Sequence, residues 1–289
     1  MTGAGRIALV SVFADGPGGG NPAPVMVDAT GLTDADMRAI AAGYGHESVF
    51  VLPPPGDSDC DFTFRFFVPH HEMEMCGHAA LGAVWLLKRL GRLPRDRIRI
   101  ATPSGAVEAQ AGPAGIEISQ PKARLEALPD EERSIDEILS VLGIARTALA
   151  PSPFWNASTS RVKTLIPLMR VSVLDGLRPD FGRIEALCEK IGSTGLYPFA
   201  ASRTGTFEAR QFPKSSGYPE DAATGIAAAA LAFGLLENGQ VAASGQPVRV
   251  RQGRAMGRPS EIRVRFDLDG AGIARGCWLG GDVRLEADQ

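Results

Sequence analysis

The sequence predicts an α+β protein built from two similar lobes, each a curved, mostly antiparallel sheet or open barrel around one buried helix. Two segments of helical length, beginning at Cys76-Gly77 and Thr224-Gly225, carry apolar residues on every side. A helix without a polar stripe has to be buried all round. Short alternating strands flank both segments, which is typical of a sheet wrapped around a helix. At 289 residues, the chain is also longer than one ordinary core usually serves.

The first half of the chain sets out one such lobe. A glycine-rich turn at 16–22 separates two predicted strands, and an amphipathic helix with a following strand comes next. The buried helix then ends at Gly91, and further strands close the lobe. The expected elements are strands at 7–13 and 23–27, a helix at 35–43, a strand at 49–51, the buried helix from 76, and strands at 98–100 and 116–118.

The second half repeats this order, so the chain reads as an internal duplication. Arg65-Phe66-Phe67-Val68-Pro69 precedes the first buried helix, and Arg210-Gln211-Phe212-Pro213 precedes the second. The helix at 184–192 corresponds to the helix at 35–43, and the strand at 198–200 corresponds to the one at 49–51. The buried helix from 224 corresponds to the one from 76, and the strand at 248–250, which a turn at 252–253 follows, corresponds to the one at 98–100. We match the strand at 262–264 with the one at 116–118.

The lobe boundaries follow from this repeat. The stretch from Pro121 to Glu132 is rich in proline, alanine and charge, and it is predicted to be the linker. We therefore expect an N-terminal lobe at 1–121, joined by the C-terminal segment 276–289, and a C-terminal lobe at 122–275.

Composition excludes several classes of function. The net charge of −3 gives no reason to expect nucleic acid or an anionic membrane as a partner. No signal peptide or long apolar span is evident, so a cytoplasmic location is expected. The four cysteines are scattered and His70-His71 are adjacent, a pattern that predicts neither a disulfide framework nor a metal site. No motif indicates a nucleotide, flavin, pyridoxal phosphate or other cofactor.

The start of each buried helix is a candidate anion site. The first turn of a helix leaves backbone N–H groups without intrahelical partners, and the helix dipole makes this end positive. Gly77 and Gly225 have no side chains, which would let a ligand carboxylate approach these N–H groups. Small residues at these positions would equally suit helix–sheet packing. If both helices begin at one cleft, the cleft is expected to bind a small carboxylate.

Four motifs, in order and at the right spacing, resemble those of a known family. They are Gly19-Gly20-Asn21-Pro22, His46-Glu47-Ser48-Val49-Phe50, Cys76-Gly77-His78-Ala79-Ala80-Leu81-Gly82 and Glu220-Asp221-Ala222-Ala223-Thr224-Gly225. Together they resemble the phenazine-biosynthesis PhzF-like isomerases, which share the diaminopimelate-epimerase fold. The resemblance covers nearly the whole chain. It implies an active site between two lobes and a homodimer.

The resemblance also implies roles for individual residues. Glu47 is expected to be the catalytic acid and base, His78 a proton relay or substrate contact, and Asp221 a catalytic group opposite the glutamate. The residues alone leave other interpretations open: a solvated loop carboxylate for Glu47, a core histidine for His78, and a helix N-cap or helix-dipole partner for Asp221. The expected substrate contacts are Asn21, Cys76, Gly77, Thr224, Gly225 and Ile226.

Three departures from the family pattern leave the substrate open. Ile226 and His46 stand where the family usually has serine, and Glu74 stands where it usually has proline. Amino-acid epimerases of this fold use two cysteines, one at each helix start, whereas here Cys76 is matched by Thr224. A threonine hydroxyl is too weak an acid for that role, so Cys76 is predicted to be a buried, inert thiol.

The sequence thus predicts a cofactor-independent isomerase that moves a proton and a double bond in a small cyclic or amino carboxylic acid. The substrate of the phenazine pathway, trans-2,3-dihydro-3-hydroxyanthranilate, is the model for this class. Two alternatives stay open: an amino-acid epimerase or racemase of the same fold, and a non-catalytic protein that binds small carboxylates.

Overall fold

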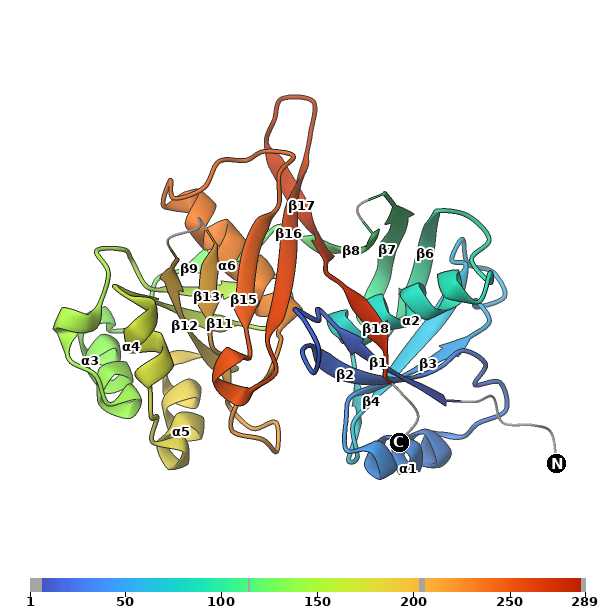
Figure 1. The fold of residues 1–289 in the computed structure, drawn as a ribbon, viewed down its shortest axis with the longest axis horizontal. Helices are drawn as coiled ribbons and strands as arrows, with labels where there is room; N and C mark the ends of the chain where they lie inside the picture. The colour runs from blue at the N-terminus through green and yellow to red at the C-terminus, as the bar shows by residue number, and fades with distance from the viewer. Residues whose placement is uncertain (1–6, 114, 203–205, 287–289) are drawn as a thin grey trace. The chain divides into compact units, whose positions relative to one another are not determined.

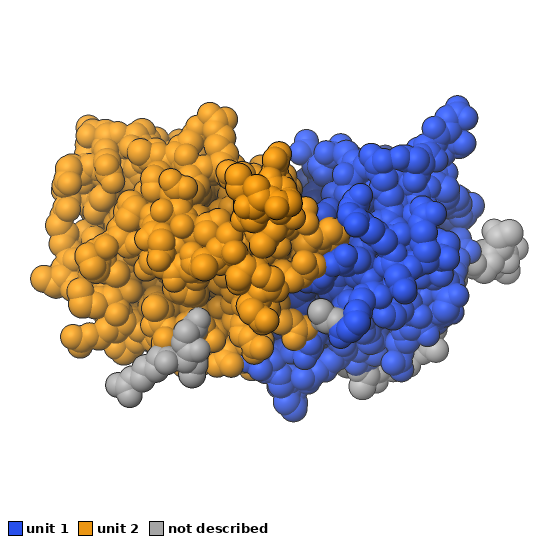
Figure 2. Space-filling view, turned by 90° about the horizontal axis from the view of Figure 1, so that it is seen from above, with its two compact units in different colours: residues 1–119, 279–289 blue, residues 120–278 orange. Residues whose placement is uncertain are grey.

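The computed structural model describes residues 7–113, 115–202 and 206–286. The chain divides into two compact units, shown in separate colours in Figure 2. Unit 1 comprises residues 1–119 and 279–289, and unit 2 comprises residues 120–278. Each unit combines a mostly antiparallel sheet with helices, so the predicted α+β class is confirmed (Figure 1).

Unit 1 contains two βαβ crossovers within its sheet. Strands β2 and β3 are parallel and joined through α1, and β4 and β6 are parallel and joined through α2. The neighbouring pairs β1–β2, β3–β4, β6–β7 and β7–β8 are antiparallel. The elements are β1 (Ile7–Val12), β2 (Asn21–Met26), α1 (Asp34–Tyr44), β3 (Ser48–Leu52), β4 (Phe62–Phe67), β5 (Glu72–Met73), α2 (Gly77–Arg89), β6 (Arg97–Thr102), β7 (Gly105–Gly112), β8 (Gly115–Pro121) and β18 (Val283–Leu285).

Unit 2 repeats the same order of pairings. Strands β11 and β12 are parallel and joined through α4 and α5, and β13 and β15 are parallel and joined through α6. The pairs β10–β11, β12–β13 and β15–β16 are antiparallel. The elements are β9 (Arg124–Glu126), α3 (Glu131–Leu142), η1 (Arg146–Ala148), β10 (Trp155–Ser158), β11 (Lys163–Leu168), α4 (Val171–Gly176), α5 (Phe181–Ile191), β12 (Gly195–Ala201), β13 (Phe207–Ala209), β14 (Phe212–Pro213), α6 (Gly225–Glu237), β15 (Val248–Gln252), η2 (Arg254–Met256), β16 (Ser260–Leu268) and β17 (Ala274–Gly280).

One detail of the sequence prediction is wrong. The strand at 262–264 is part of β16, which pairs with β15 as β7 pairs with β6, so its counterpart is β7 and not the strand at 116–118. Short alternating strands look alike in sequence, and only the pairing distinguishes successive ones. The predicted linker is also partly ordered: Arg124–Glu126 form β9, paired with β10, and α3 begins at Glu131.

The two apolar helices are buried as predicted. In α2 every residue from Gly77 to Val84 is buried, and in α6 every residue from Ala227 to Leu235 is buried. α2 contacts strands β1, β2, β3 and β7, and α6 contacts β10, β11 and β16. The approach is close: a Cβ atom at Gly82 would lie 2.8 Å from the Val10 side chain, and one at Gly234 would lie 2.8 Å from Leu165. Strands therefore surround each helix on several sides, which explains its lack of a polar face.

Other helices build a second apolar layer in each unit. α1 packs with β2, β3 and β4 around Met37 and Ala41, which are buried. In unit 2, α3, α4 and α5 pack against β11 and β12 around a larger apolar cluster that includes Ile138 and Leu187. These helices are amphipathic because one face covers the sheet and the other meets solvent.

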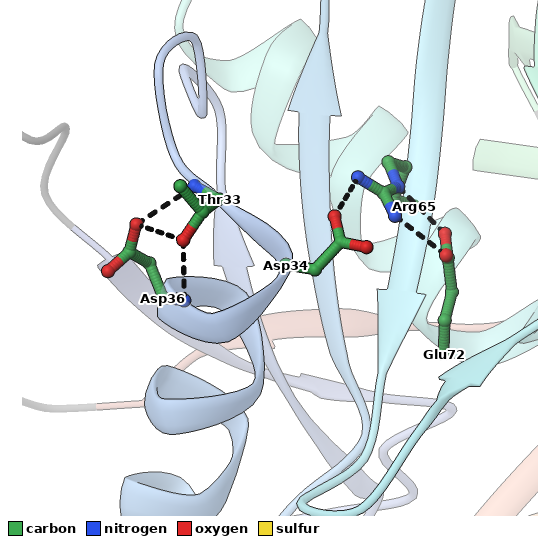
Figure 3. Close-up of polar contacts among 5 residues, drawn as sticks. All are labelled: Thr33, Asp34, Asp36, Arg65 and Glu72. Atoms are coloured by element: carbon green, nitrogen blue, oxygen red, sulfur yellow. Dashed lines mark hydrogen bonds and ion pairs between the residues drawn. The ribbon is translucent and has the colours of Figure 1, made fainter.

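An arginine pairs with a glutamate just before each buried helix. Arg65 makes a bidentate ion pair with Glu72 at 2.8 and 2.7 Å, as Figure 3 shows, and its guanidinium lies 5.0 Å from the Phe67 ring centroid. Arg210 pairs in the same way with Glu220 at 2.9 and 2.6 Å and lies 4.9 Å from the Phe212 ring centroid. We call each Arg–Phe–Glu set a clamp.

The clamps occupy matching positions, because each glutamate lies four residues before the N-cap of its helix, Cys76 in α2 and Thr224 in α6. The clamp of unit 1 has an additional partner, since Arg65 also binds Asp34 in the first turn of α1 at 2.8 Å (Figure 3). These carboxylates raise the pKa of Arg65, and Arg65 holds the pKa of Asp34 below its usual range. The repeated clamp shows that the duplication extends to side-chain interactions.

Candidate active site

Glu47 is placed by the turn between α1 and β3. A capping box of Thr33 and Asp36 starts α1 (Figure 3), and Gly45 ends the helix in the left-handed conformation with φ of 66°. Glycine adopts that conformation without steric cost. The Ser48 hydroxyl then donates to His46 O at 3.1 Å and fixes the next turn. Glu47 consequently stands directly before β3, with its side chain 20% exposed.

Cys76 and His78 are placed by the start of α2. Cys76 is the N-cap, in an extended conformation, and its side chain makes no capping hydrogen bond to the helix. His78 follows in the first turn and is buried. A cysteine is not among the side chains that cap a helix well. Its thiol is therefore directed to other side chains.

These three side chains form a compact cluster within unit 1. The Cys76 thiol donates to Glu47 Oε2 at 3.6 Å, and its Sγ lies 3.3 Å from His78 Nδ1. His78 Nε2 lies 3.5 Å from Glu47 Oε2. Cys76 and His78 are only 5% and 6% exposed, so the carboxylate is the part of the cluster that reaches the surface.

The cluster is suited to proton transfer. It contains a carboxylate as a possible base, an imidazole within reach of it, and a thiol in contact with both. General acid–base chemistry needs such groups within hydrogen-bonding reach of one another and of the substrate. The backbone N–H groups at the start of α2 lie on the same segment, and they favour an anionic group nearby. A carboxylic acid with an acidic C–H bond fits this combination.

Asp221 belongs to a separate hydrogen-bond network in unit 2. The Thr224 hydroxyl donates to Asp221 Oδ2, and Gln252 Nε2 donates to Asp221 O at 2.7 Å and to Thr224 Oγ1 at 3.1 Å. Gln252 Oε1 accepts from the Thr224 N–H at 3.3 Å and from the Tyr197 hydroxyl at 3.0 Å. This network fixes the chain at the start of α6.

Tyr197 anchors the network from the sheet. It is fully buried on β12, and this burial, with the negative charge of Asp221, raises the pKa of Tyr197 well above its usual range. The phenol therefore stays protonated at all ordinary pH values and remains a donor to Gln252. The glutamine in turn has its amide group oriented towards Thr224.

The structure brings some of the predicted residues together. Glu47, Cys76 and His78 meet in unit 1, and Asp221 and Thr224 meet in unit 2. Gly77 and Gly225 are the first residues of α2 and α6, and Ile226 follows in the first turn of α6. Asn21 pairs with Val12 at the start of β2, next to the glycine-rich turn.

The structure bears on the roles that the sequence left open for Asp221 and Cys76. The N-cap of α6 is Thr224, so Asp221 is not the cap residue itself. Cys76 is buried as predicted, but its thiol contacts both Glu47 and His78. Gln252 and Tyr197 are not among the residues predicted for the site, and the sequence indicates only a turn at Gln252. No local signal points to them, because their role comes from hydrogen bonds to distant residues.

Comparison with known proteins identifies the family. A sequence model of the phenazine biosynthesis-like proteins, PhzC-PhzF, matches residues 10–275. This chain belongs to the PhzC-PhzF family. It is 31% identical to an uncharacterized isomerase of Deinococcus radiodurans, covering 98% of this chain and 93% of that protein. It is 30% identical to a trans-2,3-dihydro-3-hydroxyanthranilate isomerase of Pseudomonas fluorescens, covering 93% and 96%.

The same fold occurs in solved structures. A PhzF-family protein of Bacillus anthracis matches with a TM-score of 0.84 at 22% identity, covering 96% of each chain. A probable proline racemase of Agrobacterium radiobacter shares the fold more distantly, with a TM-score of 0.61 at 13% identity over 98% of this chain and 92% of that one. The family predicted from the four sequence motifs is thereby confirmed. This protein is an isomerase of that family.

Across the residues that the structure describes, the helices are too short or too polar to cross a membrane.

Proposed function

We propose that this PhzC-PhzF isomerase moves a proton within a small cyclic or amino carboxylic acid, with Glu47 as the group that removes and returns it. The single observation that carries the proposal is the cluster of Glu47, Cys76 and His78 at the start of α2. The relative from Pseudomonas fluorescens, named for its action on trans-2,3-dihydro-3-hydroxyanthranilate, indicates the substrate class.

The proposed reaction needs only proton transfer. The Glu47 carboxylate takes a proton from a C–H bond activated by the unsaturated acid, and the electron pair of that bond shifts the double bond. Glu47 then gives the proton to the carbon at the far end of the shifted system, so no oxidant, reductant or leaving group is required. His78, whose Nε2 lies 3.5 Å from Glu47 Oε2, orients the carboxylate and relays protons.

The substrate carboxylate is expected to bind at helix N-termini. Neither Cys76 in α2 nor Thr224 in α6 makes a side-chain capping bond to its own helix. The first turn of a helix offers backbone N–H groups that have no acceptor in a preceding turn, and these are suitable donors to an anion. Gly77 and Gly225 keep the approach to them open, and Asn21, Cys76, Thr224 and Ile226 are the further proposed substrate contacts.

Asp221 is proposed as the second catalytic carboxylate. Its place in the family motif supports this role, as does its fixed position in the Thr224–Gln252 network. An amino-acid epimerase would require a thiol at the start of each helix, whereas Thr224 offers a hydroxyl that already donates to Asp221. The proton-shift reaction is therefore favoured over epimerisation. The homodimeric state and the cytoplasmic location stay predictions of the sequence.

The test is solvent deuterium exchange in the Glu47→Gln variant. The protein is incubated in D₂O with trans-2,3-dihydro-3-hydroxyanthranilate and with a panel of small cyclic and amino carboxylic acids, and deuterium incorporation is followed by mass spectrometry. Glutamine keeps the shape but not the basicity, so exchange should fall by about 10²–10⁴-fold. Binding, measured by calorimetry, should change little.

Glu185→Gln is the matched control, because Glu185 is an exposed carboxylate on α5, outside the proposed site. Its exchange rate should equal that of the unmodified protein. Undiminished exchange in Glu47→Gln would exclude Glu47 as the base. Binding of an acid with no exchange in the unmodified protein would instead favour the non-catalytic alternative.

A further inference from the structure

We propose that Glu47, Cys76 and His78 form a binding site for Zn²⁺, and that the bound ion reversibly blocks proton transfer. The inhibitory consequence rests on the function proposed above, whereas the metal site itself does not. The three residues each offer one ligand atom, and these atoms all lie within 4.8 Å of one another. The site lies entirely within unit 1.

The donor set matches zinc chemistry. Zn²⁺ binds cysteine thiolate, histidine nitrogen and carboxylate oxygen, and sites with three protein ligands leave a fourth position for water or another molecule. Soft thiolate and imidazole ligands favour zinc over magnesium or calcium, which prefer oxygen donors. The charges also balance, since one thiolate and one carboxylate neutralise the two charges of the ion. A largely buried site would therefore hold no net charge.

Two of the three distances between the ligand atoms match those around a tetrahedral ion. Zinc bond lengths of about 2.3 Å to sulfur and about 2.0–2.2 Å to nitrogen and oxygen require separations of about 3.6 Å from sulfur to nitrogen or oxygen. They require about 3.4 Å between nitrogen and oxygen. The observed separations are 3.6 Å for Cys76 Sγ to Glu47 Oε2 and 3.5 Å for His78 Nε2 to Glu47 Oε2.

The His78 ring has to turn before all three residues can hold one ion. Cys76 Sγ lies 3.3 Å from His78 Nδ1 and 4.0 Å from Nε2, whereas an ion bound to Nε2 in the plane of the ring would hold the sulfur about 5 Å from Nδ1. Binding therefore requires a change in the side-chain torsions of His78. The backbone already brings the three side chains together, because Cys76 and His78 are two residues apart at the start of α2 and Glu47 is fixed before β3.

Zinc and substrate would compete for the same groups. A zinc-bound Glu47 cannot act as a base, because the ion occupies the carboxylate oxygen that would accept the proton. Binding requires loss of the thiol proton, so the affinity for zinc should fall as the pH is lowered.

The experiment uses Co²⁺ as a spectroscopic probe of the full-length protein. Cobalt bound to a thiolate gives a near-ultraviolet charge-transfer band, and a tetrahedral site gives intense visible bands. Titration of the unmodified protein with Co²⁺ should produce the charge-transfer band and the visible bands. Added Zn²⁺ should displace Co²⁺ and remove these bands, and the concentration needed gives the affinity for Zn²⁺. Absence of the charge-transfer band in the unmodified protein would overturn the proposal, whatever the variants do.

Two matched cysteine variants locate the site. Cys76→Ser should lose the charge-transfer band and bind zinc more weakly by at least about 10–100-fold, because even removing a hydrogen-bond partner of a metal ligand typically costs that much. Cys60→Ser should keep both, because Cys60 is the partly exposed thiol of unit 1, outside the cluster. Glu47→Gln should weaken binding while keeping the band. A band that survives in Cys76→Ser, or disappears in Cys60→Ser, would contradict the site.

Deuterium exchange with and without Zn²⁺ separates this proposal from the proposed function. Zinc should abolish exchange in the unmodified protein, and a chelator should restore it. If zinc binds as described but Glu47→Gln still exchanges, the catalytic role of Glu47 fails and the metal site stands. If Glu47→Gln loses exchange but no zinc binds, the metal site fails and the catalytic role stands.

Discussion

Cys76 and Thr224 occupy the same position in the duplicated fold but have different partners. Each is the N-cap of a buried helix, and neither side chain caps that helix. The Cys76 thiol contacts Glu47 and His78, whereas the Thr224 hydroxyl donates to Asp221. The duplicated backbone therefore carries a cluster of titratable side chains in unit 1 and a fixed hydrogen-bond network in unit 2.

The residue after Gln252 is expected to be intolerant of a side chain. Gly253 has a φ of 79°, and a Cβ atom there would lie 2.2 Å from Arg258 O and 2.6 Å from Ala222 O. Gly253→Ala should therefore lower the free energy of unfolding by the left-handed strain of about 1–2 kcal/mol, plus about 1–3 kcal/mol for the overlap. Urea denaturation measures the loss.

Gly257→Ala is the control, because Gly257 has a similar φ of 70° and no atom within 4 Å of an added Cβ. It should show the conformational strain alone. Equal losses in the two variants would mean that the backbone around Gln252 adjusts to the extra atom without cost.

At the scale of elements, the two clamps are the most informative repeat. Each joins the strand segment before the buried helix to the residues that lead into it, through the pairs Arg65–Glu72 and Arg210–Glu220. The clamp of unit 2 is more deeply buried: the Arg210 side chain is 8% exposed, compared with 25% for Arg65. Arg210 also donates to Leu174 O and Leu177 O, both at 3.1 Å, and thereby joins α4 to the clamp.

Removing the clamp arginine should lower the free energy of unfolding more in unit 2 than in unit 1. Arg210→Met leaves Glu220 buried without its partner, a change that typically costs about 3–5 kcal/mol of stability. Arg65→Met should cost less because Glu72 is closer to solvent. Urea denaturation of the two variants gives the comparison.

The double variant Arg210→Met/Glu220→Met checks the mechanism. It removes both charges, so it should recover a large part of the stability lost by Arg210→Met. A double variant no more stable than Arg210→Met would show that the arginine acts through its bonds to α4 and not through the buried charge of Glu220.

At the scale of the whole molecule, the chain leaves unit 1 after Ser119 and returns to it at Leu279. The returning segment completes unit 1, because β18 pairs with β1 through Val10–Leu285, Ser11–Arg284 and Val12–Val283. The Glu286 N–H also donates to Leu9 O at 2.9 Å. Unit 1 thus depends on residues from both ends of the described chain.

Deleting residues 283–289 should destabilise unit 1 selectively. Without β18, strand β1 loses one of its two neighbours, and its amides lose hydrogen bonds that contribute about 0.5–1.5 kcal/mol each. Hydrogen exchange at residues 10–12 should accelerate by at least about tenfold. The amides of β15 in unit 2 are the internal control and should exchange at an unchanged rate. Equal acceleration in β1 and β15 would show that the two units unfold together.

The sequence predicted the fold well because its main signals are local. The apolar helices α2 and α6, the helices α1 and α5, and the strands β1, β3, β6, β8, β12 and β15 all follow from periodicity and from the repeat. The match of 262–264 with 116–118 failed because short alternating strands do not reveal which neighbour they pair with. The strand β9 within the predicted linker was not predicted, because its three residues pair with β10, a partner about thirty residues away along the chain.

The sequence by itself therefore determined the elements, the duplication and the family, because periodicity and motifs depend on neighbouring residues. Only the tertiary structure decided that Glu47, 29 residues before Cys76, lies against both Cys76 and His78, and that Tyr197 and Gln252 hold Thr224. These contacts join segments that are distant along the chain, so they arise from packing of the sheet around α2 and α6. The chemistry proposed for unit 1 depends on that packing as much as on the residue types.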